Sequence, residues 1–187
     1  MSESIKIRPV EIKDCEEILS IYQPFILNSS VTFEYEVPSL QVFTERVLDI
    51  QKSYPYYVAE KNNHIIGYCY AHKFRERTAF DWICETSIYI SSDSIGKGLG
   101  HQLYDTLSNS LIEMGIHRMY ACITSPNPNS ICFHKNYGFQ ELGIFPHAGF
   151  KLGEWHDVTF LEKILIGDCG NPLPIKTWGD LRTRKRE

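Results

Sequence analysis

The stretch from Thr78 to Leu111 most constrains the fold, because it joins an apolar strand-like run, a glycine loop and an amphipathic helix. The loop reads Ile95-Gly-Lys-Gly-Leu-Gly100, and the residues after it carry leucine at every fourth position. A strand that leads through such a loop into a helix N-terminus presents successive backbone N–H groups to an anion. Glu85 lies on the strand a few residues upstream. The stretch therefore predicts a phosphate cradle beside a candidate catalytic base.

The composition is that of one globular domain, with 43% hydrophobic and 22% charged residues in a chain of 187. The net charge of −4 argues against nucleic acid as the main partner. No apolar run approaches the ~18 residues of a membrane span, and the first residues lack a signal-peptide core. We therefore expect a cytoplasmic protein. Six cysteines without a CxxC pair, and histidines without metal-ligand spacing, predict neither disulfides nor a metal site.

Periodicity and turn residues predict alternating strands and helices around the central stretch. We expect helices over residues 14–28, 40–51, 98–114 and 128–137. We expect strands over residues 5–9, 56–60, 65–77, 79–91, 119–124, 139–145 and 155–164. A glycine-rich loop is expected at 147–154, and the residues from Gly167 onward are expected to form an extension outside the core.

The glycine loop does not fit either of two common nucleotide-binding motifs. A Rossmann fingerprint needs a third glycine where His101 or Leu103 stands, and a Walker A loop needs Ser or Thr where Gly98 follows Lys97. What remains is a short cradle for one phosphate or pyrophosphate, with the helix dipole adding partial positive charge. A purely structural glycine turn remains the alternative at this point.

The residues after the loop continue the pattern with a strand, a short helix and the pair Gly138-Phe139. This order resembles the GNAT acyl-CoA N-acyltransferases over about residues 5–165. Further segments resemble the phosphinothricin and methionine sulfoximine N-acetyltransferase branch: Ile7–Pro9, Val31–Glu34, Tyr54-Pro55, Val58–Glu60, Gly67–Ala71, Phe74–Arg77, Glu85–Tyr89 and Gly149–Val158. The resemblance implies an α+β, three-layer GNAT fold, with a mixed, mostly antiparallel sheet of about six to seven strands flanked by about four helices. The GNAT domain would span residues 1–165, with an extension over 166–187.

The resemblance also implies acetyl-CoA as co-substrate, with no metal. The pantetheine arm would pair with the backbone of Ile88, Tyr89 and Ile90, and Asn127 and Ser130 would touch the rest of the molecule. The pyrophosphate would be held by Gly96, Lys97, Gly98, Leu99, Gly100 and His101. Relatives usually carry Arg or Gln where Ile95 stands, so this chain loses one side-chain contact and relies on the backbone there.

The implied reaction is direct acetyl transfer to the α-amino group of a small amino-acid-like acceptor, such as phosphinothricin, methionine sulfoximine or methionine sulfone. An ammonium group must lose a proton before it attacks a thioester, and Glu85 is the candidate base because its apolar strand should raise its pKa. The alternative for Glu85 is an ion pair with Arg75 or Arg77. The resemblance makes His134 the candidate proton donor to the CoA thiolate, and a helix-surface histidine bonded to a carbonyl is the alternative.

For the acceptor, the resemblance points to Arg75 and Arg77, whose spacing of two would place them on one face of a strand. Paired guanidinium groups suit a carboxylate and a phosphinyl or sulfonyl oxygen. Phe80 stands where relatives often carry Tyr, and Phe33 and Glu34 would line the pocket near the partner subunit of a homodimer. Two alternatives stay open: acetylation of a protein N-terminus, a lysine or a polyamine, and a non-catalytic CoA-binding sensor.

Overall fold

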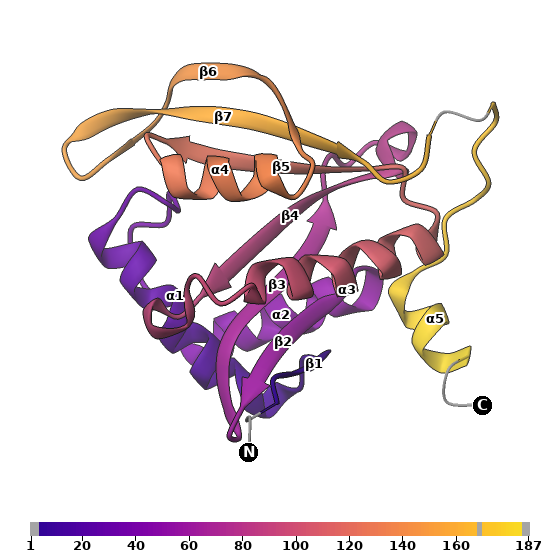
Figure 1. Cartoon of the computed structure of the whole chain (residues 1–187), viewed down its shortest axis with the longest axis horizontal. Helices are drawn as coiled ribbons and strands as arrows, with labels where there is room; N and C mark the ends of the chain where they lie inside the picture. The colour runs from indigo at the N-terminus through magenta and orange to yellow at the C-terminus, as the bar shows by residue number, and fades with distance from the viewer. Residues whose placement is uncertain (1–3, 168–169, 185–187) are drawn as a thin grey trace.

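A computed structural model describes residues 4–167 and 170–184 and shows a single open sheet with helices on both faces (Figure 1). The seven strands are β1 (Lys6–Pro9), β2 (Tyr56–Lys61), β3 (His64–Lys73), β4 (Ile83–Ile90), β5 (Arg118–Ser125), β6 (Gln140–Lys151) and β7 (Glu154–Ile164). Their order across the sheet is β1-β2-β3-β4-β5-β7-β6. Only the β4–β5 pair is parallel, so the expected mixed, mostly antiparallel sheet is confirmed.

The described residues contain five α-helices, one more than expected: α1 (Cys15–Asn28), α2 (Leu40–Ser53), α3 (Leu99–Met114), α4 (Pro128–Asn136) and α5 (Trp178–Arg184). Three short 3-10 helices join them: η1 (Ile12–Asp14), η2 (Thr78–Phe80) and η3 (Ser92–Ser94). Helices α1 and α2 cover one face of the sheet and α3 the other (Figure 1), which divides the buried apolar residues into two clusters. No helix within the described ranges is long and apolar enough to cross a membrane.

The parallel pair β4–β5 holds together over only a short distance. The register runs from Ile83 opposite Arg118 to Glu85 opposite Tyr120, and no further pair follows among the described residues. The Thr86 hydroxyl makes one more link, donating to the Tyr120 carbonyl at 3.2 Å. Beyond that point the two strands diverge (Figure 1), which leaves the β5-facing edge of β4 without a strand partner in the described chain.

Several local elements form as the sequence predicts. The Ser39 side chain caps α2 by accepting from the Val42 N–H at 3.3 Å. Asn62 and Asn63 both take positive φ, 53° and 62°, in the two-residue turn between β2 and β3. Pro24 predicts a kink or a break in this first helix, but α1 continues through Pro24 without a break.

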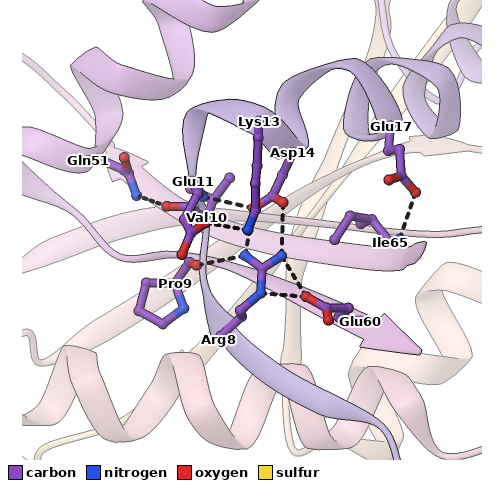
Figure 2. A network of polar contacts seen from close by, with 10 residues as sticks. All are labelled: Arg8, Pro9, Val10, Glu11, Lys13, Asp14, Glu17, Gln51, Glu60 and Ile65. Carbon is purple, nitrogen blue, oxygen red and sulfur yellow. Dashed lines mark hydrogen bonds and ion pairs between the residues drawn. The ribbon is translucent and has the colours of Figure 1, made fainter. Parts of the chain in front are cut away.

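At the start of the chain, an ion-pair network joins β1, β2 and the beginning of α1 (Figure 2). The Arg8 guanidinium donates to Asp14 at 2.6 and 2.8 Å and to Glu60 at 2.6 Å. Burial alone would raise the pKa of Asp14, but the bonds from Arg8 and from the Glu11 N–H lower it below its usual value. Asp14 therefore lies at the N-cap position of α1, but its carboxylate accepts hydrogen bonds from Arg8 and does not cap the helix.

Three boundaries differ from expectation. Strand β4 starts at Ile83 and not near Ala79, because η2 and a turn occupy the preceding residues. Strand β6 extends to Lys151 and strand β7 begins at Glu154, so most of the loop expected at 147–154 belongs to the sheet. The residues after Gly167 do not lie wholly outside the core, since α5 buries Trp178 and Leu181 to 3% and 6% exposure. Cross-strand pairing and tertiary packing, which local sequence does not encode, decide all three.

Candidate active site

A groove of about 570 Å³ lies where β4 and β5 separate. Its lining includes most of the predicted cofactor residues: Ile88, Tyr89, Ile90, Gly96, Gly98, Leu99, Gly100, His101, Asn127 and Ser130. The structure therefore brings together residues from β4, the glycine loop, α3 and α4. Lys97 does not line the groove, because its Nζ donates to the Asp93 carbonyl at 2.6 Å.

The glycines of the loop have different physical roles. Gly96 and Gly98 take φ of 81° and 73°, a left-handed conformation that non-glycine residues adopt only with strain. Gly100 lies in the first turn of α3, where an added Cβ would stand 2.7 Å from the Phe133 ring. The loop and the N-terminus of α3 thus present backbone N–H groups to the groove, an arrangement that suits a pyrophosphate. Ile95 is 64% exposed beside it.

A second, narrower cavity of about 60 Å³ continues the groove inward between the diverging strands. It shares Ile88, Tyr89, Asn127 and Ser130 with the larger groove. Its remaining wall comes from the following residues: Val31, Thr86, Ser87, Ala121, Cys122, Ile123, Thr124 and His134. A groove that narrows between two strands fits a thioester whose acyl end is small.

His134 lies at this inner end with both ring nitrogens engaged. Nδ1 lies 2.8 Å from the Ser130 carbonyl, which can only accept, so Nδ1 carries the hydrogen. Nε2 lies 2.8 Å from the Tyr104 hydroxyl. Burial lowers the pKa of His134, partly offset by the Ser130 bond, so the ring is neutral near pH 7 and Nε2 accepts from Tyr104. These contacts favour a positioning role, and a proton-donor role for His134 stays a prediction.

Glu85 occupies the last β4–β5 pair, on the strand face opposite the buried Cys84 and Thr86. Its side chain is 27% exposed, and its Oε1 lies 3.9 Å from His72 Nε2. Burial raises the pKa of the Cys122 thiol to about 12, helped by the charge of Glu85 and a hydrogen bond to it, while Arg75 acts in the opposite direction. Glu85, His72, Cys122 and Arg75 thus form one cluster, and its member Cys122 lines the narrow cavity.

The expectation that Arg75 and Arg77 share a strand face is wrong, because β3 ends at Lys73 and both arginines follow in an exposed loop. The Arg75 guanidinium stacks over the Phe74 ring at 5.1 Å. Phe80 is 37% exposed and also contacts Phe74, with ring centroids 6.3 Å apart. Arg75 is within electrostatic reach of Cys122, whereas no comparable contact joins Arg77 to the cluster in the described structure.

The loop that carries Phe33 and Glu34 is fastened to the tip of the β6–β7 hairpin. The Phe33 ring packs on Gly149, where an added Cβ would stand 2.3 Å from it. The Lys151 Nζ donates to the Thr32 carbonyl at 2.7 Å, although Lys151 is only 2% exposed. The Glu34 carboxylate pairs with Arg46 at 2.6 Å, so it is engaged within its own chain. These contacts place Phe33 and Glu34 over the Glu85 face of the sheet.

Sequence reasoning missed two side chains that interact with Glu85, those of His72 and Cys122. His72 lies directly opposite Glu85 in the β3–β4 register, and Cys122 lies two residues past the last β4–β5 pair. The register across β3 and β4 could not be counted from sequence, because an irregular connection of nine residues, 74–82, separates them. Cys122 reads as an ordinary apolar strand residue until the pairing is known.

Comparison with known proteins shows the family to which the chain belongs. Residues 7–160 match the family model described as an acetyltransferase (GNAT) domain. The chain is 33% identical over 159 residues to a phosphinothricin N-acetyltransferase of Streptomyces viridochromogenes, covering 85% of this chain and 87% of that protein. It is also 33% identical over 162 residues to an L-methionine sulfoximine/L-methionine sulfone acetyltransferase of Pseudomonas aeruginosa, covering 85% and 94%.

Among solved structures, the fold is similar to a GNAT superfamily phosphinothricin acetyltransferase from Sinorhizobium meliloti in complex with AcCoA. The TM-score is 0.87 at 34% identity, covering 93% of this chain and 98% of that one. The structural similarity covers nearly the whole chain, so the fold is that of a known family. The chain belongs to the GNAT acetyltransferases and is an N-acetyltransferase.

Proposed function

We propose that this enzyme transfers the acetyl group of acetyl-CoA to the α-amino group of a small amino-acid-like acceptor of the phosphinothricin, methionine sulfoximine or methionine sulfone type. The observation that carries the proposal is the position of Glu85. Its carboxylate interacts with Cys122, which lines the narrow cavity, and the next residues of its strand, Thr86 and Ser87, line the same cavity. The relatives named above supply the acceptor class, since their names specify those substrates.

In this proposal, backbone groups bind the cofactor, and Glu85 acts on the acceptor. The backbone of Ile88–Ile90 and the glycine loop bind the cofactor, because the free strand edge and the α3 N-terminus offer N–H groups to pantetheine and pyrophosphate. Glu85 removes a proton from the acceptor ammonium, directly or through a water. The free amine then attacks the thioester, and a strand N–H near Tyr89 or Ile90 stabilises the oxyanion.

The acceptor's anionic groups would meet the loop that follows β3. Arg75 offers a guanidinium fixed over Phe74, close enough to the Glu85 cluster to act on Cys122. Arg77 and Phe80 lie farther along the same exposed segment, and Phe33 packs on Gly149 of the β6–β7 hairpin. A cation beside the base suits a zwitterionic acceptor and repels a polyamine.

The test is an acceptor panel with purified protein and acetyl-CoA, read as thiol release. Methionine sulfoximine, methionine sulfone and phosphinothricin should give at least about tenfold higher kcat/KM than spermidine, lysine or a peptide with a free N-terminus. Preference for the peptide would support the alternative that the enzyme acetylates a protein N-terminus. That alternative has a precedent in a structural relative, a ribosomal-protein-alanine N-acetyltransferase from Brucella melitensis that is 30% identical to this chain. Thermal stabilisation by CoA without turnover on any acceptor would indicate a sensor.

We also propose that the enzyme is a homodimer that pairs through β6 and β7. β6 is an edge strand, and this hairpin exposes large apolar side chains: Leu142, Ile144, Phe145, Phe150, Leu152 and Trp155. An exposed apolar patch on an edge hairpin is typical of an interaction surface. Light scattering should give twice the chain mass, and Phe145→Glu should halve it; a monomeric wild-type protein would contradict the proposal.

A further inference from the structure

His72 stands directly across from Glu85 in the antiparallel β3–β4 pair. Its Nε2 lies 3.9 Å from Glu85 Oε1, and the two side chains are 34% and 27% exposed. The pair therefore extends from the candidate base at the end of the cleft to the solvent. Neither His72 nor its contact with Glu85 has a part in the function proposed above.

A backbone contact determines which ring nitrogen of His72 carries the hydrogen. The other nitrogen, which has a lone pair, faces the Glu85 carboxylate. Nδ1 lies 3.2 Å from the Lys73 carbonyl oxygen, which can only accept, so Nδ1 carries the hydrogen of the neutral ring. Nε2 is then unprotonated and points toward Glu85. A basic nitrogen in this position can receive a proton from a protonated Glu85 but cannot donate one to it.

The proton balance of N-acetylation explains why a second acceptor is useful. The acceptor nitrogen begins as an ammonium and ends as an amide, so it loses two protons for each acetyl group gained. One of them finishes on the sulfur of CoA and the other goes to solvent. A single carboxylate holds only one proton at a time, so Glu85 must lose the first proton before it can take a second one from the nitrogen.

The other groups that face Glu85 cannot take its proton near neutral pH. The Cys122 thiol on β5 and the Tyr70 phenol on β3 already carry their protons, since burial raises the pKa of each. Arg75, from the loop after β3, is a permanent cation. Glu34 and Arg46, which reach this region from the side of α2, are paired with each other at 2.6 Å. In the described structure this leaves His72 as the basic side chain beside Glu85.

We propose that His72 is a proton relay that acts through Glu85. Glu85 takes a proton from the acceptor ammonium. A small side-chain rotation closes the 3.9 Å separation to hydrogen-bond distance, Glu85 Oε1 passes the proton to His72 Nε2, and the imidazolium releases it to solvent. The carboxylate is thereby restored before it removes the second nitrogen proton during attack on the thioester, and this second proton then passes to the sulfur of CoA. This inference rests on the proposed function, because it assigns His72 to the same reaction.

The test compares pH–rate profiles of the wild-type enzyme and His72→Gln, with methionine sulfoximine as acceptor and thiol release as readout. The variant should lower kcat about tenfold, less than the 10²–10⁴-fold expected for direct loss of an acid–base group. It should leave the KM for acetyl-CoA within about twofold, and it should remove one ionisation from the acid side of the kcat profile. In His72→Ala, added imidazole should restore part of the rate, because the site opens to solvent.

His64→Gln is the matched control. His64 is also on β3 and faces a carboxylate, with Nδ1 3.5 Å from Glu17, but it is 79% exposed at the far end of the strand. This variant should keep the wild-type profile. Thermal unfolding and acetyl-CoA binding of every variant show whether it is folded.

Three results would overturn the relay. An active wild-type enzyme whose His72→Gln variant keeps both kcat and the acid-side ionisation contradicts the relay alone. A loss of kcat with an unchanged profile shape and no rescue by imidazole would assign His72 a structural role. A wild-type protein that releases CoA with none of the acceptors overturns the proposed function and the relay with it.

Discussion

The cofactor half and the acceptor half of the cleft are built in different ways. The cofactor half comes mainly from one continuous stretch, residues 88–101, in which the end of β4, the glycine loop and the start of α3 follow one another. The acceptor half collects residues from distant segments: the loop after α1, the loop after β3, strand β5 and the β6–β7 tip. The first half follows from local sequence rules, whereas the second exists only once the chain has folded.

The contacts that hold the acceptor half illustrate the difference. Lys151 Nζ binds the Thr32 carbonyl across 119 residues of sequence, and the Tyr35 hydroxyl donates to the Phe150 carbonyl across 115. The Phe33 ring fits against Gly149 because that residue has no side chain. Such pairings leave no periodic signal in the sequence. A variant in the cofactor half should therefore act on acetyl-CoA alone, and one in the acceptor half on the acceptor alone.

Glu85→Gln should give the largest effect, because the base belongs to neither half but lies between them. The amide keeps the size of the side chain but cannot accept a proton, so kcat should fall about 10²–10⁴-fold. The acetyl-CoA dissociation constant, measured by calorimetry, should stay within about twofold. A variant that loses acetyl-CoA binding together with turnover would mean that Glu85 is structural.

Gly100→Ala tests the cofactor half. The new methyl would stand 2.7 Å from the Phe133 ring, so the ring or the first turn of α3 must shift. Overpacking of this kind typically costs about 1–3 kcal/mol, and the shift should weaken acetyl-CoA binding about tenfold while leaving the acceptor KM unchanged. Gly143→Ala is the control, because nothing lies within 4 Å of a Cβ added there. Equal binding by the two variants would contradict this account of the glycine loop.

The success of the sequence predictions follows the same division. The glycine loop and the helix behind it were predicted from local sequence, and the resemblance to the GNAT family supplied Ile88, Tyr89 and Ile90, all three of which line the groove. Lys97 is the exception, since a side-chain contact with the Asp93 carbonyl turns it away from the groove. The mixed, mostly antiparallel sheet was expected from the resemblance to the GNAT family, and the structure confirms it.

The acceptor half was predicted less well for a physical reason. Arg75 and Arg77 were placed on a strand because spacing alone suggested it, but β3 ends at Lys73 and the irregular loop separates the two side chains in environment. His72 was missed because its partner Glu85 is set by a register that no short turn defines. Burial of Trp178 and Leu181 likewise depends on packing against distant elements.

His134→Asn tests whether the inner end of the cleft is held by a neutral imidazole. The pKa of His134 is lowered by folding, so the unfolded chain binds more protons below its ordinary pKa of about 6.5. Wild-type stability should therefore fall as pH drops from about 7 toward 5, and the variant should lose part of this dependence. At pH 7.5 the free energy of unfolding of the variant should be about 1–3 kcal/mol lower than that of the wild-type protein, because Tyr104 and Ser130 lose a hydrogen-bond partner. Denaturant titrations at several pH values measure both effects.

Arg75→Gln and Arg77→Gln should give the smallest effects and separate two residues that the sequence treats alike. Both are exposed, and an exposed charge pair contributes about 0.2–1 kcal/mol, so Arg75→Gln should raise the acceptor KM by up to about fivefold. Arg77→Gln should change it less, because only Arg75 is positioned over Phe74 and within electrostatic reach of the Glu85 cluster. The acetyl-CoA KM should be unchanged in both, and added salt should reduce the Arg75 effect. A larger effect at Arg77 would mean that the loop rearranges when the acceptor binds, and that the acceptor half is completed by its substrate.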